Sequence, residues 1–168
     1  MRIYLIGFMG SGKSTLGKRL ARRLDYGFQD LDHEVEKNQG MSVGEIFSKH
    51  GEAYFRKLEQ KQLHETALHD NMVIATGGGT PCFFDNMDFI IRSGMSVYLR
   101  MSHLSLAHRL ENAFTRRPLL DDLQGEPLQQ YIAQKLQERE PYYLQAHCII
   151  KGETVKPDHI ISLVFGES

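Results

Sequence analysis

Cysteine is scarce in this sequence. Cys82 and Cys148 are the two cysteines among 168 residues, and they lie far apart in the chain. Secreted domains that depend on disulfides carry more cysteines at closer spacing, so the pattern excludes a disulfide framework. Unpaired thiols beside seven methionines are typical of a reducing compartment. We therefore expect a cytoplasmic protein.

Long apolar runs are absent as well. The first residues superficially resemble a signal peptide, but the apolar stretch is short, ends at Gly7 and leads directly into Lys13 and Ser14. No later run approaches the roughly 18 residues that a membrane-spanning helix requires. The sequence predicts neither a signal peptide nor a membrane span, and we expect no membrane partner.

An excess of one charge is the third missing feature. The chain has 20 Lys and Arg against 21 Asp and Glu, for a net charge of −1. Proteins that bind nucleic acid usually carry a strongly basic surface, so we expect no nucleic-acid partner. Because the overall charge is balanced, any anionic ligand must be held by a local group of residues.

The chain also lacks repeats, low-complexity tracts and linkers, so we expect one domain over residues 1–168. Short apolar runs alternate with longer amphipathic segments, which favours strands alternating with helices. The predicted strands cover residues 2–6, 28–31, 72–75, 95–99 and 148–150. The predicted helices cover residues 13–24, 45–68 with a break near Gly51, 102–110, 128–143 and 158–165.

Five strands separated by helices predict an α/β fold. The crossover connections make the sheet mostly parallel and place helices on both faces, which gives a three-layer α/β/α architecture with a five-stranded sheet. Ligands of such sheets bind beyond the carboxyl ends of the strands. We therefore expect the functional residues just after Ile6, Leu31, Ala75, Leu99 and Ile150.

A glycine-rich motif follows the first predicted strand. Residues 7–15 read GFMGSGKST and match G-x-x-x-x-G-K-[ST], with a strand before and a helix after. Glycines let backbone N–H groups close around a phosphate, and the helix N-terminus adds positive charge. Lys13 can reach the β- and γ-phosphates, and the Ser14 hydroxyl can bind Mg²⁺. The motif predicts an ATP or GTP site that contains Gly10, Ser11, Gly12, Lys13, Ser14 and Thr15.

Two other classes of protein are excluded. A GTPase reads guanine with Asn-Lys-x-Asp, which the sequence lacks, and the D-x-x-G match at residues 122–125 follows no apolar strand. His64 and His69 nearly form the zinc motif H-E-x-x-H, but their spacing of five places them about 140° apart on a helix. We expect both histidines to lie on the surface.

Two aspartates, Asp30 and Asp32, end the second predicted strand. Alternate residues of a strand share a face, so both carboxylates would point toward the ligand edge. One carboxylate could join a Mg²⁺ shell, while the other could bind a substrate hydroxyl and take its proton. The alternative is a turn followed by a helix cap at Asp32. The nearby phosphate loop favours the functional interpretation.

Another polar pair and a glycine triplet follow. Arg56 and Glu59 are three positions apart in a predicted helix, so the carboxylate can hold the guanidinium. Gly77, Gly78 and Gly79 come directly after the third predicted strand and leave bare backbone for a small ligand to approach. A tight turn would explain one glycine but not three.

Taken in order, these motifs resemble those of the shikimate kinase family along nearly the whole chain. The resemblance rests on the phosphate loop, Asp30-x-Asp32, Phe55-Arg56-x-x-Glu59, Gly77–Gly79, Arg117-Pro118-Leu119-Leu120 and Arg139-x-Pro141-Tyr142. Each motif alone is modest, but the ordered set is highly specific. It implies a P-loop kinase of the nucleoside monophosphate kinase-like superfamily. Such a kinase transfers the γ-phosphoryl group of ATP to the 3-hydroxyl of shikimate, with Mg²⁺, in aromatic amino acid biosynthesis.

The resemblance also implies residue roles. Asp32 would bind the substrate hydroxyls and act as the catalytic base, and Asp30 would join Ser14 at Mg²⁺. Arg56 and Arg139 would clamp the substrate carboxylate. The amides of Gly78 and Gly79 would complete an acceptor site whose main segment spans approximately residues 32–60. Phe47 and Phe55 would form its aromatic wall, although both could equally be core residues, and Arg139 could be a solvated helix charge.

The nucleotide side of the site follows from the same resemblance. A small lid over approximately residues 112–125 would carry Arg117 to the transferring phosphate, where it would act with Lys13. Arg116 adjoins Arg117, and the position before Pro118 matches the family better. Arg109 and Lys156 fall in the regions that contact adenine. Thr80–Pro81 departs from the family, which more often has an aliphatic residue after the glycine turn.

Three functions compete for this sequence: a shikimate kinase, a related kinase such as a gluconate or nucleoside monophosphate kinase, and a non-catalytic nucleotide-dependent binding module. The glycine triplet with the Arg56–Glu59 pair argues against the related kinases. Lys13, Asp32 and Arg117 argue against a module without catalysis. We expect ATP and shikimate as the partners, and the small size and balanced charge are compatible with a monomer.

Overall fold

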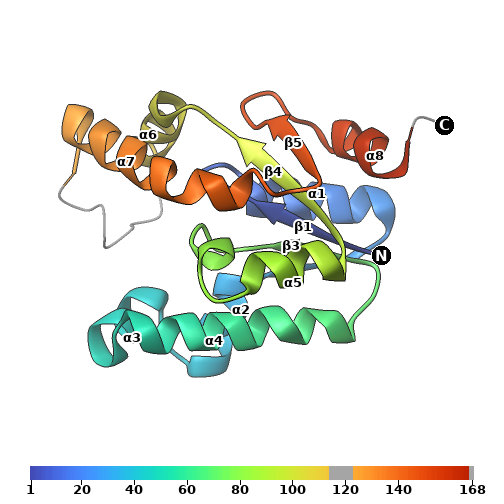
Figure 1. Cartoon of the computed structure of the whole chain (residues 1–168), viewed down its shortest axis with the longest axis horizontal. Coiled ribbons are helices and arrows are strands. Elements are labelled where there is room, and N and C mark those ends of the chain that lie inside the picture. The colour runs from blue at the N-terminus through green and yellow to red at the C-terminus, as the bar shows by residue number, and fades with distance from the viewer. Residues whose placement is uncertain (114–122, 167–168) are drawn as a thin grey trace.

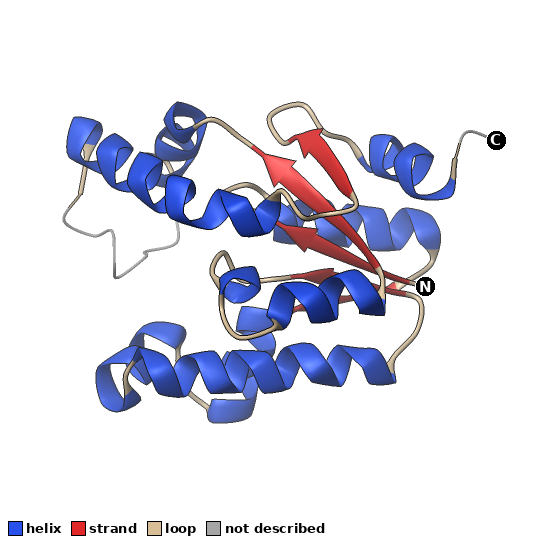
Figure 2. Ribbon diagram, in the orientation of Figure 1, coloured by secondary structure: helices blue, strands red, loops and turns tan. Residues whose placement is uncertain are grey.

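The computed structural model describes residues 1–113 and 123–166. Its centre is a five-stranded sheet in which every neighbouring pair of strands is parallel (Figure 2). The spatial order is β2-β3-β1-β4-β5. The strands are β1 (Arg2–Ile6), β2 (Gly27–Asp30), β3 (Met72–Ala75), β4 (Met95–Arg100) and β5 (Cys148–Lys151). The predicted parallel sheet is confirmed, and all five carboxyl ends lie at one edge.

Helices cover both faces of the sheet, as Figure 1 shows. One face is covered by α1 (Lys13–Leu24) and α8 (Pro157–Phe165), and the other by α4 (Glu52–Glu65), α5 (Asn86–Ser93) and α7 (Gly125–Tyr143). The remaining elements are α2 (Leu31–Gln39), α3 (Val43–His50), α6 (His103–Glu111) and the 3-10 turns η1 (Thr66–Leu68) and η2 (Thr80–Cys82). This is the predicted three-layer α/β/α architecture.

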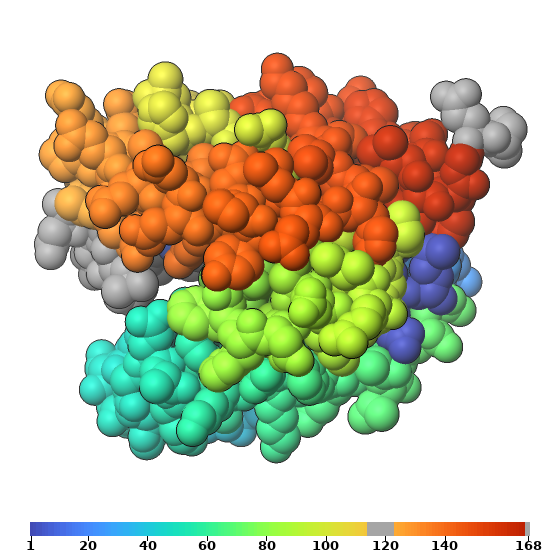
Figure 3. All heavy atoms as spheres, viewed as in Figure 1, coloured from blue at the N-terminus to red at the C-terminus, as the bar shows by residue number. Residues whose placement is uncertain are grey.

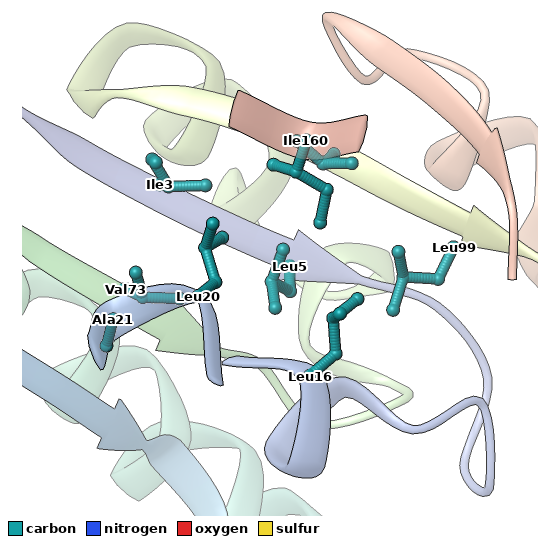
Figure 4. Packing of buried hydrophobic residues seen from close by; sticks show 9 residues of the cluster. Ile3, Leu5, Leu16, Leu20, Ala21, Val73, Leu99 and Ile160 are labelled. Atoms are coloured by element: carbon teal, nitrogen blue, oxygen red, sulfur yellow. The ribbon is translucent and has the colours of Figure 1, made fainter. Parts of the chain in front are cut away.

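The central strand β1 explains why the layers pack. Residues 3–6 are all fully buried, because a parallel strand in the middle of such a sheet is covered on both faces. Ile3 and Leu5 face α1, which presents Leu16, Leu20 and Ala21 from one side of the helix (Figure 4). Tyr4 and Ile6 face the opposite core, with residues of α4, α5 and α7.

A third apolar cluster anchors the loop that follows β1. Phe8 is buried together with Met101 after β4, Leu106 and Ala107 of α6, and Ile132 of α7. The loop therefore sits on a packed base formed by α6 and α7. Among the described residues no helix is long and apolar enough to cross a membrane.

Three parts of the prediction need correction. The second strand ends at Asp30 and not at Leu31, because α2 begins directly at Leu31. The helix α2 was considered only as the alternative in which Asp32 caps a helix, and the residue that caps it is Asp30. The helix α5 was not predicted. It is short, and the apolar residues that it buries, Met87 and Ile90, are too few to give a clear period. The break at Gly51 between α3 and α4 is confirmed.

Candidate active site

The loop between β1 and α1 has the backbone of a phosphate-binding loop. Gly7, Gly10 and Gly12 have φ values of 152°, 82° and 88°, which side chains other than glycine rarely adopt. Gly12 is the N-cap of α1 and uses no side chain to cap the helix, so the first N–H groups of α1 remain for a ligand. The buried Ser11 hydroxyl has no hydrogen-bond partner among the described residues. An anion would satisfy these donors.

Lys13 lies along its own loop. Its Nζ donates to the carbonyl oxygens of Gly7 at 2.7 Å and Phe8 at 3.0 Å, and the residue is buried. The ammonium is therefore held at the concave side of the loop, next to the positions where phosphate oxygens would bind. This is the location predicted from the motif.

Asp30 joins the second strand to the phosphate loop. Its Oδ2 accepts a hydrogen bond from the Ser14 hydroxyl, and its Oδ1 accepts one from the backbone N–H of His33 at 3.2 Å. Asp30 is thus the N-cap of α2, and Asp32 lies in the first turn of that helix. The prediction that both carboxylates sit on one strand face is wrong, because the helix begins one residue after Asp30.

The Ser14–Asp30 pair fits a magnesium ion. Both side chains offer oxygen, the ligand atom that Mg²⁺ prefers, and the ion usually takes its other ligands from water and substrate phosphates. In the described part of the chain no cluster of three or more His, Cys, Asp or Glu forms a metal cage. A site with one carboxylate and one hydroxyl beside a phosphate loop therefore suits a cation that arrives with a nucleotide.

The Gly77–Gly79 segment, here called the glycine turn, brings the rest of the site together. None of the three glycines has a positive φ, so backbone conformation does not explain them. Their neighbours do. A Cβ on Gly77 would lie 2.8 Å from Asp32 Oδ1 and 2.9 Å from Glu59 Oε2, closer than side chains tolerate.

The other two glycines make room for the two arginines. A Cβ on Gly79 would lie 2.6 Å from Nη1 of Arg56, and one on Gly78 would lie 3.3 Å from Nη1 of Arg139. The same Gly78 position is 3.1 Å from the backbone nitrogen of Met9 in the phosphate loop. The turn therefore contacts Asp32, both arginines and the nucleotide loop at once, which confirms that these residues lie together.

Arg56 is buried and rigidly held. Its Nη1 donates to Glu59 Oε1 at 3.0 Å, and its Nε and Nη2 donate to Glu52 Oε1 at 3.4 and 3.3 Å. The ring of Phe83 lies 4.0 Å from Cζ of the guanidinium. Burial raises the pKa of Glu59, and Arg56 and the Thr80 hydroxyl oppose that shift.

Arg139 comes from the last turns of α7. Its buried Nη1 has no hydrogen-bond partner among the described residues, and its Cζ lies 5.4 Å from the centre of the Phe8 ring. A buried guanidinium nitrogen without a partner is costly unless a ligand satisfies it. This favours the predicted carboxylate-binding role over a solvated helix charge.

Sequence reasoning missed three residues that support this centre. Tyr143 is fully buried and donates a hydrogen bond from its hydroxyl to the Gly78 carbonyl. Phe83 covers the Arg56 guanidinium, and Thr80 donates to Glu59 at 2.8 Å. The Arg-x-Pro-Tyr motif stopped one residue short of Tyr143, Thr80 was noted only as a departure from the family, and Phe83 stands in no local motif that would have marked it.

Cys82 also lies beside the arginines. Burial raises the pKa of its thiol to about 11, while Arg139 and Arg56 act in the opposite direction. The side chain is therefore a neutral thiol at neutral pH and behaves as an apolar side chain beside the two arginines.

The remaining predicted site residues in the described part of the chain are Arg109, Lys156, Phe47 and Phe55. Arg109 of α6 reaches the phosphate loop, because its Nη1 lies 3.2 Å from where a Cβ of Gly12 would be. Lys156 is exposed at the N-cap of α8. Phe47 and Phe55 pack against each other with ring centres 5.0 Å apart in a small core with Ile46, and the centre of the Phe55 ring also lies 5.3 Å from Cζ of Arg56.

Arg116, Arg117 and most of the predicted lid lie outside the described residues. In the space-filling view of Figure 3, the orange α7 lies directly against the green segment that follows β3. The glycine turn belongs to that segment, and Arg139 belongs to α7.

A parallel sheet with a phosphate loop after its first strand, a carboxylate–hydroxyl pair and two arginines gathered at a glycine turn defines a P-loop kinase. The family model for shikimate kinase matches residues 9–165, and the chain belongs to the shikimate kinase family. It is therefore an ATP-dependent kinase.

Relatives and solved structures support this assignment. A shikimate kinase of Bacteroides thetaiotaomicron is 45% identical over 156 residues, which cover 93% of this chain and 89% of the relative. The crystal structure of a shikimate kinase from that organism has a TM-score of 0.95 and 41% identity, and each chain is covered to 98%. The structure of Acinetobacter baumannii shikimate kinase in complex with shikimate has a TM-score of 0.85 and 34% identity over 98% of this chain and 92% of that one.

More distant structures share the fold alone. A deoxyadenosine kinase from M. mycoides has a TM-score of 0.63 at 14% identity, and a gluconokinase from Sinorhizobium meliloti has a TM-score of 0.56 at 15% identity. They cover 99% and 98% of this chain, and the chain covers 100% and 90% of theirs. Gluconokinase, one of the competing kinases considered from the sequence, therefore has the same architecture at low identity.

Proposed function

We propose that this protein transfers the γ-phosphoryl group of ATP to the 3-hydroxyl of shikimate and releases shikimate 3-phosphate and ADP. The observation that carries the proposal is the glycine turn, because Gly78 lies against the phosphate loop and Arg139 while Gly79 lies against Arg56. An acceptor with one carboxylate and several hydroxyls matches two guanidinium groups and a nearby carboxylate. The shikimate-bound relative, at 34% identity, supports the same acceptor.

The proposed mechanism depends on position and charge. Arg56 and Arg139 bind the acceptor carboxylate and place its reactive hydroxyl beside Asp32 and the phosphate loop. Asp32 accepts the proton of that hydroxyl as the new O–P bond forms. Lys13 and the N–H groups of the loop stabilise the charge on the transferred group and on the departing ADP. Proximity of the bound reactants supplies much of the rate acceleration.

Magnesium would be held by Ser14 and Asp30. When bound there with ATP, the ion would neutralise phosphate charge.

We further propose that Arg117 meets the phosphate from a lid at residues 112–125 and that Arg109 and Lys156 contact adenine. The segment that binds the acceptor is residues 32–60. The protein is one cytoplasmic domain and acts as a monomer. Sedimentation at the chain mass of 19.3 kDa tests the monomer.

The first experiment measures ADP release with Mg-ATP and one acceptor at a time. The acceptors are shikimate, quinate, gluconate and a nucleoside monophosphate, and Lys13→Ala is the blank. We expect release with shikimate alone. Release with another acceptor would overturn the acceptor and the roles of both arginines. ATP binding without ADP release in the presence of any acceptor would favour a non-catalytic nucleotide-dependent binding module.

A second experiment tests the base. Asp32→Asn keeps the shape of the side chain but removes its ability to take a proton, so turnover should fall about 10²- to 10⁴-fold, the usual contribution of such a base. Binding of ATP, followed by calorimetry, should remain. Wild-type turnover in Asp32→Asn would show that another group accepts the proton.

A further inference from the structure

The residue that directly follows the glycine turn carries a buried hydroxyl. Thr80 is fully buried, and its Oγ1 donates to Glu59 Oε2 at 2.8 Å. Its backbone is fixed as well, because its N–H donates to Gly77 and its carbonyl accepts from the side chain of Asn86 at 2.9 Å. The hydroxyl thus has a rigid base and one acceptor, which is a carboxylate oxygen in the acceptor site.

Glu59 needs both of its partners. The carboxylate is 1% exposed, so water cannot satisfy its oxygens. Oε1 accepts from Arg56 at 3.0 Å, and Oε2 accepts from Thr80. A carboxylate anchored at both oxygens cannot rotate about its last bond, and hydrogen bonds to a charged group are among the strongest in proteins.

The position of Glu59 in turn determines which N–H groups of Arg56 remain for a ligand. A guanidinium has five N–H groups. The bonds to Glu59 and Glu52 use one N–H on each of its three nitrogens. One N–H on Nη1 and one on Nη2 are left for the oxygens of a ligand carboxylate, and these two N–H groups are the Arg56 fork.

We propose that Thr80 is a positioning residue that fixes Glu59, and through it the Arg56 fork, for the carboxylate of the acceptor. The inference rests on the proposed function, because it assigns Arg56 to that carboxylate. Thr80 itself contacts no substrate in this scheme. Its hydroxyl sets the angle at which Arg56 presents its two remaining N–H groups, and the Phe83 ring packs against the guanidinium.

The test is steady-state kinetics of Thr80→Val, which keeps the branched shape and removes the hydroxyl, and of Thr80→Ser, which keeps the hydroxyl. We expect Thr80→Val to raise the KM for shikimate about tenfold, the effect of losing one hydrogen bond to a charged group, with the KM for ATP unchanged. Thr80→Ser should restore most of the affinity.

Thr66→Val is the matched control. Thr66 is as buried as Thr80 and also donates a hydrogen bond, to the carbonyl of Leu63, but it lies beyond the end of α4 and away from the arginines. Its loss should lower stability without changing the KM for shikimate. If Thr66→Val and Thr80→Val raise that KM equally, or if Thr80→Ser fails to rescue a stably folded protein, Thr80 has only a structural role.

A wild-type KM for shikimate in Thr80→Val would also overturn the proposal. The proposed function fails on a different result, the absence of shikimate-dependent ADP release in the wild-type protein.

The pH dependence of the KM for shikimate gives a second readout. Without the Thr80 hydroxyl, Glu59 should become protonated at a higher pH and release Arg56. The charged or titratable groups around Glu59 are Arg56 and Glu52 on α4, Asp32 on α2, Cys82 on η2 and Arg139 on α7. The KM for shikimate should therefore begin to rise at a higher pH in Thr80→Val than in the wild type as the solution is acidified.

Discussion

Glycine at position 79 makes room for the guanidinium of Arg56. Its φ of −92° suits any residue, so Gly79→Ala changes the available space and not the backbone. The added Cβ would stand 2.6 Å from Nη1 and 2.9 Å from Cζ of Arg56, so the guanidinium would have to leave its position. We expect the KM for shikimate to rise at least about tenfold, one lost charge-assisted interaction, in steady-state assays.

Gly27→Ala is the control for Gly79→Ala. A Cβ there would also displace the end of a flexible side chain, Met72, but at the amino-terminal start of β2, away from the site. It should leave the KM for shikimate at the wild-type value. Equal effects of the two alanines would mean that the loss at position 79 does not act through Arg56.

The ionisation of Glu59 gives a pH-dependent prediction. Burial raises its pKa in the folded protein above the value of 4.5 that applies when it is exposed. Its contribution to stability is therefore present below pH 4.5 and is lost as the pH rises through the folded pKa. The side chain of Glu59→Gln stays neutral at every pH, so the stability of this variant does not change with this group. The difference in unfolding free energy between the wild type and Glu59→Gln should therefore narrow from pH 4.5 upward in urea titrations. A deficit that widens would mean that Arg56 lowers the pKa of Glu59 below its exposed value.

At the scale of elements, Gly94 lets α5 turn into β4 beside the start of β1. A Cβ at this position would lie 2.4 Å from the backbone oxygen of Arg2, and neither strand can shift without breaking the pairing of Ile3 with Met95. Overpacking of this kind costs about 1–3 kcal/mol or more. We expect Gly94→Ala to lower the unfolding free energy by about 3 kcal/mol in urea denaturation.

Arg92→Ala is the comparison for Gly94→Ala. This residue is exposed on the last turn of α5, so its loss should stay within about 0.5 kcal/mol, as for other surface substitutions. Similar losses from the two variants would show that the strand connection is not tightly packed.

Local patterns in the sequence predicted those parts of the fold that are determined by residues close together in the chain. The phosphate loop and β1 follow from a motif in which every residue acts on its neighbours, and α1 follows from a leucine every fourth position. The boundary at Asp30 was missed because an aspartate that caps a helix looks like one that ends a strand. The roles of Thr80 and Phe83 could not be found, because their partners are more than twenty residues away in the chain.

At the scale of the whole molecule, the proposed nucleotide and acceptor sites share one edge of the sheet. Binding there should stabilise the folded state without any other change. Shikimate at 100 times its dissociation constant should add about 2.7 kcal/mol to the unfolding free energy. In Arg56→Lys and Arg139→Lys the same concentration should add less, because a lysine cannot form the two-pronged contact. Thermal shift assays measure this, and equal stabilisation of all three proteins would remove both arginines from the acceptor site.

The strand order has a consequence for how the chain acquires its structure during synthesis. β1 is made first, yet its two partners, β3 and β4, begin at Met72 and Met95, while β2 pairs with β3 and lies one strand away from β1. The phosphate loop therefore stays without its flanking strands until more than half of the polypeptide has emerged. Such long-range pairing folds slowly and leaves an apolar strand exposed meanwhile. A nascent chain of this protein therefore exposes the apolar β1 well before its ATP site can form.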